Sequence, residues 1–148
     1  MFKLLPLSSK LKNIDNFLPS LKYARVIKVY DGDTITVAGK TSIFGKMYKF
    51  KIRLDGLDTP DMRSNNQEEK EHAMTIRNIL YEKIFDKIVK LDIKQTDKYG
   101  RYLCDVFYNN ININQWLLDN KLAVKYDGGK KREFDKNNFD VLFHIYNN

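Results

Sequence analysis

Acidic and arginine residues gather in three short segments of the chain, and together they have the chemistry needed to cleave a phosphodiester bond with the help of a metal ion. The segments are Val29–Thr34, Arg53–Asp61 and Thr96–Arg101. Carboxylates are ligands that hard cations such as Ca²⁺ prefer, and guanidinium groups bind phosphate through paired hydrogen bonds. Groups of both kinds in one place could hold a phosphate and stabilise the charge that grows on it during attack.

Two arginines, Arg53 and Arg101, are the candidates for holding the phosphate. Arginine is permanently charged and planar, and it donates two parallel hydrogen bonds to a phosphate group. A single arginine usually lies on a solvated surface, where an ion pair contributes little. Two arginines in segments that a small barrel could bring together favour a phosphate site.

Asp33 and Asp58 are the candidate metal ligands, although either one alone would indicate only a turn, because Asp-Gly and Asp-Thr-Pro are common turn sequences. Together they can supply part of the oxygen shell that Ca²⁺ accepts, with the backbone carbonyl of Thr59 and water supplying the rest. The absence of His and Cys nearby argues against zinc. Asp31 is expected to orient water or a ligand.

Strands are expected to position these groups. The segment 48–55 alternates strictly, which places Tyr48, Phe50, Ile52 and Leu54 on the core face and Arg53 on the opposite face. Residues 26–29 and 34–37 are two β-rich runs joined by Asp31-Gly32, a dipeptide suited to a tight hairpin, so Asp33 should stand at a strand end. Residues 89–93 and 102–108 read as two further strands around the loop that carries Arg101.

Helical patterns separate and follow these strands. A helix is expected from Glu68 to about Phe85, with a buried stripe of Ala73, Ile76, Leu80 and Ile84. Asn114 is the expected N-cap of a short helix with Trp116, and the last segment, with Phe134, Phe139, Leu142 and Phe143, should be helical and docked. Five strands in this order predict a mainly β, α+β fold: a five-stranded OB-type barrel with about three helices.

The composition limits the classes of protein. The 148 residues suit one domain, at 21–148, behind a leader at 1–20 that we expect to pack loosely or to be mobile. A net charge of +7 favours a polyanionic partner, although it also fits a basic, soluble surface. Cys104 stands alone and is read as a core thiol. No apolar stretch could span a bilayer and no clear export signal begins the chain, so we predict no membrane contact and an intracellular location.

The three segments resemble, in order and approximate spacing, the motifs of the staphylococcal nuclease (thermonuclease) family, over about Tyr23 to Tyr126. The resemblance implies an OB-type barrel and a Ca²⁺-dependent endonuclease that cleaves DNA and RNA with little sequence specificity, leaving 3′-phosphate and 5′-hydroxyl ends. We expect a monomer without a protein partner, and a preference for single-stranded or locally opened substrate. The residue-by-residue match implies Asp33, Asp58 and Thr59 as calcium ligands, Arg53 and Arg101 as the phosphate clamp, and Lys98, Tyr99 and Tyr126 as substrate contacts.

One residue departs from the family pattern. After Asp-Thr-Pro the family usually carries a glutamate that holds or activates the attacking water, whereas this chain has Asp61, which is one methylene shorter. We predict that Asp61 still acts as the base, through a shifted loop or a bridging water, in a slower enzyme unless the loop has adjusted. The alternatives are a catalytically weak or inactive OB-fold module that binds nucleic acid, and a structural or protein-binding barrel.

Overall fold

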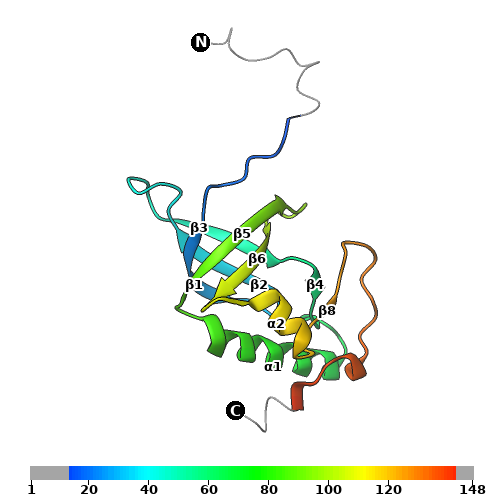
Figure 1. The fold of residues 1–148 in the computed structure, drawn as a ribbon. Coiled ribbons are helices and arrows are strands. Elements are labelled where there is room, and N and C mark those ends of the chain that lie inside the picture. Colours follow the sequence, from blue (N-terminus) through cyan, green and yellow to red (C-terminus); the bar gives the residue numbers. More distant parts are fainter. Residues whose placement is uncertain (1–13, 143–148) are drawn as a thin grey trace.

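Five strands close into a barrel in the computed structural model, which describes residues 14–142 (Figure 1). The barrel strands are β1 (Tyr23–Val29), β2 (Thr34–Gly39), β3 (Tyr48–Leu54), β5 (Ile88–Thr96) and β6 (Tyr102–Tyr108). Their order is β3-β2-β1-β5-β6, all antiparallel, and a parallel pairing of β3 with β6 closes the circle. This confirms the predicted five-stranded, mainly β, OB-type architecture.

The other elements are short, apart from one long helix. They are β4 (Leu57–Asp58), α1 (Gln67–Ile84), β7 (Ile111–Asn112), α2 (Ile113–Asp119), β8 (Val124–Lys125) and the 3-10 helix η3 (Lys136–Asn138). Figure 1 shows α1 lying along one side of the barrel, with α2 on the same side. No helix among residues 14–142 is long and apolar enough to cross a membrane.

The helix α1 forms where the sequence predicts it. Asn66 caps it by accepting hydrogen bonds from the backbone N–H groups of Glu68 and Glu69, at 2.9 and 3.2 Å. The two acidic side chains of that first turn suit the positive end of the helix dipole. The predicted stripe is the buried face: Ala73, Ile76, Leu80 and Ile84. It packs into one hydrophobic core with the strands, and the core also contains Cys104, as predicted.

The link between β1 and β2 lies where the sequence places it, around Asp31-Gly32. It has four residues, Tyr30 to Asp33, and is held by a 2.9 Å hydrogen bond from the Tyr30 N–H to the Thr34 carbonyl. Gly32 is required here because a larger residue would not fit. A Cβ at that position would meet Ile76 Cγ2 at 2.7 Å and Thr59 Cγ2 at 2.8 Å. The glycine therefore lets this acidic loop pack closely against α1 and the start of the Thr59-Pro60 segment.

The predicted N-cap of α2 is wrong. The cap is Asn112, whose side chain accepts from the Gln115 N–H at 3.1 Å, so the helix begins at Ile113. Asn114 is buried within the first turn, where its Oδ1 accepts from the Val106 N–H and its Nδ2 donates to the carbonyls of Asp55 and Cys104. Its side chain satisfies backbone groups on strands distant in sequence, a contact that local pattern does not reveal.

The strict alternation of β3 also fails at one end. Ile52 and Leu54 are fully buried, as predicted, but Tyr48 is 53% exposed and Phe50 only half-buried. The parallel partner β6 pairs only with Ile52, Arg53 and Leu54. The first half of β3 therefore projects beyond the closed barrel, and its side chains have less of the molecule to pack against.

The two ends of the described chain contain little regular structure. Residues 14–20 contain no helix or strand, yet Pro19 is buried and Leu21 joins the core; the rest of the predicted leader lies outside the described residues. Of the predicted C-terminal helix, the described residues show the 3-10 helix η3 and two helical residues, at 141 and 142. This segment is nonetheless docked, because Phe134 packs edge-on against His72 of α1 at a centroid distance of 5.3 Å. Residues 143–148 are outside the description.

Candidate active site

One cavity of about 750 Å³ collects all the residues that the sequence singled out. They come from the loop before β2, the end of β3, the segment around β4, the turn between β5 and β6, and the segment after β8. The predicted residues that line it are Asp31, Asp33, Arg53, Asp58, Thr59, Asp61, Lys98, Tyr99, Arg101 and Tyr126. The barrel closure brings these segments together, because β3 pairs with β2 on one edge and with β6 on the other.

Arg53 lies at the centre of the acidic side of this cavity. Its Nη1 is 3.3 Å from Asp33 Oδ2, and its Nη2 is 3.3 Å from Asp58 Oδ1. The same Nη1 donates to the backbone carbonyls of Leu54 and Leu57, at 3.1 and 3.0 Å. The side chain is only 11% exposed. It points away from the hydrophobic core, as predicted, and two carboxylates and two carbonyls fix its orientation.

Asp33 ties the loop before β2 to the Asp58-Thr59 segment. Its Oδ2 accepts from the backbone N–H of Thr59 at 3.2 Å and from the Thr59 hydroxyl at 3.0 Å. Its Oδ1 accepts from the Thr34 hydroxyl at 2.9 Å. A buried carboxylate is stable only with such partners, so Asp33 and Thr59 hold each other in place.

The carboxylates of the cavity are crowded. Burial, the charge of Asp33 and a hydrogen bond with its side chain raise the pKa of Asp31 from 3.8 to about 7. Burial also raises the pKa of Asp58, against the opposing effect of Lys131, whose Nζ lies 3.7 Å from Asp58 Oδ2. The surroundings of both carboxyl groups therefore favour the neutral form, chiefly because the groups are buried.

This donor set fits a hard cation such as Ca²⁺, which the family resemblance implies. Asp33 and Asp58 offer carboxylate oxygens at one wall of the cavity, and a cation there would favour the charged form of Asp58, whose pKa burial raises. Within residues 14–142, no group of three or more His, Cys, Asp or Glu side chains is assembled to hold a metal ion. Backbone oxygens and water would therefore have to complete the coordination.

The raised pKa of Asp31 predicts a pH-dependent effect on stability. The folded protein holds this proton more tightly than the unfolded chain, so the stability contributed by the neutral form is present near pH 4 and is lost as the pH rises to about 7. Asp31→Asn keeps the oxygen that accepts from the Asp33 N–H and removes the charge. Without divalent cations, thermal unfolding should show a higher Tm than the parent at about pH 8, and little difference at about pH 4.

The control for that experiment is Asp135→Asn. Asp135 is exposed and also accepts a hydrogen bond from the N–H two residues ahead, that of Asn137, at 3.0 Å. It therefore matches Asp31 in charge and local geometry but not in burial. An equal Tm gain in both variants, or a larger gain for Asp31→Asn at the acidic pH, would show that the crowding of Asp31 is not responsible.

The turn between β5 and β6 presents Arg101 to the opposite side of the cavity. Its Nε donates to Asp97 Oδ2 at 2.6 Å, and its Nη1 is 3.4 Å from the Thr34 hydroxyl oxygen. Asp97 Oδ1 accepts from the backbone N–H groups of Tyr99 and Arg101, at 2.8 and 2.9 Å. Although burial opposes it, these hydrogen bonds hold the pKa of Asp97 below its usual value. Asp97 is thus a positioning residue that the sequence reading did not assign.

Asp61 lies at the rim of the cavity and is exposed. Its Oδ1 accepts from the Arg63 N–H at 2.8 Å, and its own N–H donates to Glu69 Oε1 of α1 at 3.0 Å. Among the described residues, Oδ2 makes no hydrogen bond. One oxygen of Asp61 therefore shapes the loop, while the other is available to water.

The remaining wall is aromatic and basic. Tyr99 is 71% exposed, and Lys98 Nζ lies 5.2 Å from the centre of its ring. Tyr126 donates its N–H to the Gly56 carbonyl at 3.0 Å and its hydroxyl to the Gly129 carbonyl at 2.7 Å. Of the basic stretch at 130–132, only Lys131 lines this cavity. The contact of Lys131 with Asp58 depends on the docked C-terminal segment.

Several known proteins are similar in sequence to this chain. The family model described as staphylococcal nuclease homologue matches residues 51–142, which is more than half of the chain. The chain is 33% identical to an uncharacterised protein of Methanocaldococcus jannaschii, with 70% of this chain and 59% of that protein covered. It is 32% identical to a probable staphylococcal-like nuclease of Oryza sativa, with 57% and 21% covered. An uncharacterised endonuclease of Haemophilus influenzae is 29% identical, with 69% and 51% covered. The chain thus spans less than two thirds of each of these relatives.

Proposed function

The chain belongs to the staphylococcal nuclease family, and on that premise we propose that it is a Ca²⁺-dependent endonuclease that hydrolyses DNA and RNA with little sequence specificity. The expected products carry 3′-phosphate and 5′-hydroxyl ends. Single-stranded or locally opened nucleic acid is the preferred substrate. The monomeric state, the intracellular location and the division at residues 20 and 21 stay predictions.

The observation that carries this proposal is the pairing of two arginines across one acidic cavity. Arg53 and Arg101 line the same 750 Å³ space as Asp33 and Asp58. A cavity meant only for cations would have no use for guanidinium groups, and a phosphate site alone would be weakened by buried carboxylates. A cavity that must hold both a cation and a phosphodiester needs both sets.

Each side chain then has a defined task. Arg101 donates to the non-bridging oxygens of the phosphate from the β5–β6 turn, and Arg53 does so from the end of β3, so both stabilise the charge that develops as water attacks. Asp33, Asp58 and the Thr59 carbonyl would hold Ca²⁺, which would supply Lewis-acid polarisation of the phosphate. Lys98 and Lys131 attract neighbouring phosphates, and the rings of Tyr99 and Tyr126 contact the substrate.

Asp61 accepts the proton of the attacking water through Oδ2. Its other oxygen is committed to the Arg63 N–H, which fixes the direction of the carboxylate. A general base must reach its proton directly or through one water. Because Asp61 stands at the rim, a bridging water is the route that we propose, in keeping with a slower nuclease than a glutamate would give.

Cleavage of fluorescently labelled single-stranded DNA and RNA tests the proposal. We expect fragments to form with Ca²⁺ and to disappear with a chelator, and the chemical identity of the fragment ends to be 3′-phosphate. Cleavage that persists in chelator would contradict the metal-dependent mechanism. Strands that are bound but left intact in Ca²⁺ would instead support a barrel that binds nucleic acid without cutting it.

A further inference from the structure

A second hollow, of about 550 Å³, runs along the first half of β3, and we call it the β3 groove. Its lining includes four aromatic side chains and two lysines: Phe17, Tyr48, Phe50, Tyr102, Lys49 and Lys51. None of the described residues that line it is acidic, whereas the active-site cavity contains several aspartates. Its chemistry therefore favours an anion that carries flat rings.

We propose that the β3 groove binds the single-stranded part of a nucleic acid that continues beyond the phosphate held at Arg101, an inference that rests on the proposed nuclease function. The groove adds a binding surface outside the active-site cavity. It supplies affinity for longer strands and leaves the cleavage step unchanged.

The aromatic side chains of the groove form a fixed floor and exposed walls. Phe50 and Tyr102 are half-buried and contact each other, with ring centroids 6.1 Å apart at 59°, so their positions are set by the core beneath them. Tyr48 is 53% and Phe17 79% exposed. Exposed rings beside lysines are the usual platform for single-stranded nucleic acid, because bases stack on the rings and phosphates meet the ammonium groups.

The open edge of β3 explains why these rings are accessible. Tyr48 to Lys51 pair with β2 on one edge, from Gly39 to Thr36. On the other edge, no strand in the described part of the chain pairs with them, because β6 begins its pairing at Ile52. Lysines on an open edge also discourage pairing with other proteins. That role alone would not require four aromatic residues around them.

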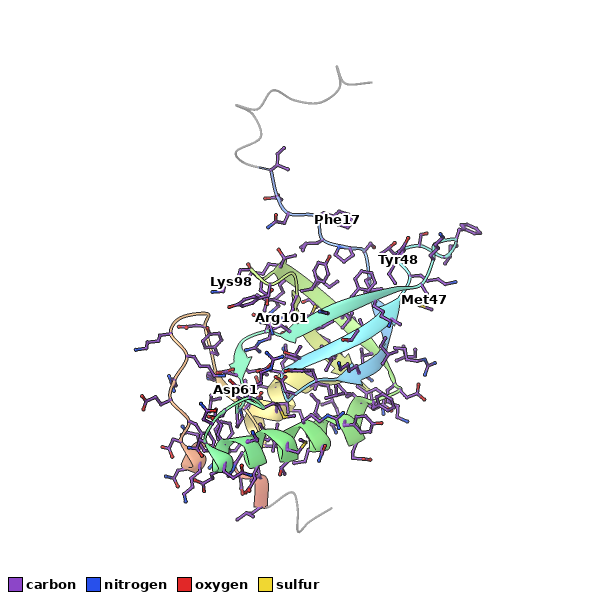
Figure 2. All side chains as sticks on the ribbon, turned by 180° about the vertical axis from the view of Figure 1, so that it is seen from behind. Phe17, Met47, Tyr48, Asp61, Lys98 and Arg101 are labelled. Carbon is purple, nitrogen blue, oxygen red and sulfur yellow. The ribbon has the colours of Figure 1, made fainter. Side chains whose placement is uncertain are left out.

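The groove and the active-site cavity meet at the β5–β6 turn. Gly100 lines the groove, while its neighbours Tyr99 and Arg101 line the cavity. Gly100 has a φ of +79°, and a Cβ added there would meet nothing within 4 Å, so the backbone leaves open space between the two. In Figure 2, Phe17 and Tyr48 lie at the same end of the barrel as Lys98, and Asp61 lies toward the other end, beyond Arg101. A strand that crosses the cavity can continue over this turn.

Fluorescence anisotropy in chelator measures this binding without cleavage. Two labelled oligothymidylates distinguish the two surfaces. One of about four nucleotides is expected to occupy only the active-site cavity, and one of about sixteen to reach the β3 groove as well. We expect Tyr48→Ala to weaken binding of the longer strand about tenfold and to leave the shorter one unchanged. Lys51→Gln should weaken binding of the longer strand by a smaller factor, and this effect should decrease at high salt.

Matched controls lie outside the groove. Phe44 is an aromatic residue that is 96% exposed in the loop between β2 and β3, and Lys70 is exposed on α1. Phe44→Ala and Lys70→Gln should leave the Kd of both strands at the parent value. Equal affinity of Tyr48→Ala and the parent for the longer strand would overturn the inference, and so would an equal loss for both strand lengths.

The two proposals fail independently in this design. If the parent cleaves nucleic acid with Ca²⁺ but Tyr48→Ala binds the longer strand normally, the groove inference is wrong and the nuclease proposal stands. If the parent never cleaves but Tyr48→Ala loses affinity for the longer strand alone, the groove inference stands and the nuclease proposal is wrong.

Discussion

Arg101→Ala is expected to lower kcat for single-stranded DNA about a thousandfold. The guanidinium is held at the cavity by Asp97, so its charge is in place before substrate binds and needs no rearrangement during attack. Removing it takes away donors from a phosphate that gains charge in the transition state. Single-turnover rates with saturating enzyme and Ca²⁺ measure this loss apart from any change in substrate affinity.

The same variant should remain folded. Asp97 keeps its hydrogen bonds to the backbone N–H groups at 99 and 101, so the turn survives the loss of one side-chain partner, at a cost of about 1 kcal/mol. Arg53→Ala is a poorer test, because it leaves the buried Asp33 and Asp58 without their shared partner and is expected to lower the Tm strongly.

Two controls accompany Arg101→Ala. Arg25→Ala removes an equal charge from a surface ion pair with Asp86, far from the cavity, and should keep the parental rate. Arg101→Lys keeps the charge but loses the paired donors, and should recover only part of the activity. A parental rate in Arg101→Ala, or a full recovery in Arg101→Lys, would contradict the proposed phosphate clamp.

Asp61→Asn is expected to reduce kcat by at least about a hundredfold. The amide keeps the oxygen that accepts from the Arg63 N–H, so the loop should retain its shape while the group that takes the proton of water is lost. The measurement is the single-turnover rate in Ca²⁺, together with the Kd for an uncleaved strand in chelator. The Kd should not rise, since the lost carboxylate attracts no phosphate.

The adjacent Glu69 supplies the control for that variant. Glu69→Gln removes a carboxylate that accepts from the Asp61 N–H but does not line the cavity, and the new amide oxygen can still accept. Its rate should stay near that of the parent. A large loss in Glu69→Gln with a normal rate in Asp61→Asn would move the role of base to Glu69. Asp61→Glu extends the side chain by one methylene and should be at least as fast as the parent.

Much of the fold could be predicted because its signals are local. The stripe of α1 follows from helical spacing, and the outward direction of Arg53 follows from strand alternation next to the buried Ile52 and Leu54. In each case neighbours in sequence make the deciding contacts.

The misread residues depend on partners far away in the chain. Asn114 was mistaken for a cap because its bonds to Val106, Cys104 and Asp55 exist only once the strands are assembled. Gly32 suited a hairpin by sequence, but its small size is required by α1 and Thr59. Strand alternation predicts that Tyr48 faces the core. The alternation cannot indicate that the closed barrel ends before Tyr48, where the pairing of β3 with β6 stops.

The sequence by itself determined which chemical groups this protein has and in which short segments they lie: the acids, the two arginines, and the aspartate that stands where the family usually has glutamate. Tertiary structure alone decided how they meet. Closure of the barrel places Arg53 beside Asp33, brings Arg101 to the Thr34 hydroxyl, and leaves the edge of β3 open beside the cavity. These contacts join segments tens of residues apart, and their energies depend on burial and distance, which the order of residues does not contain.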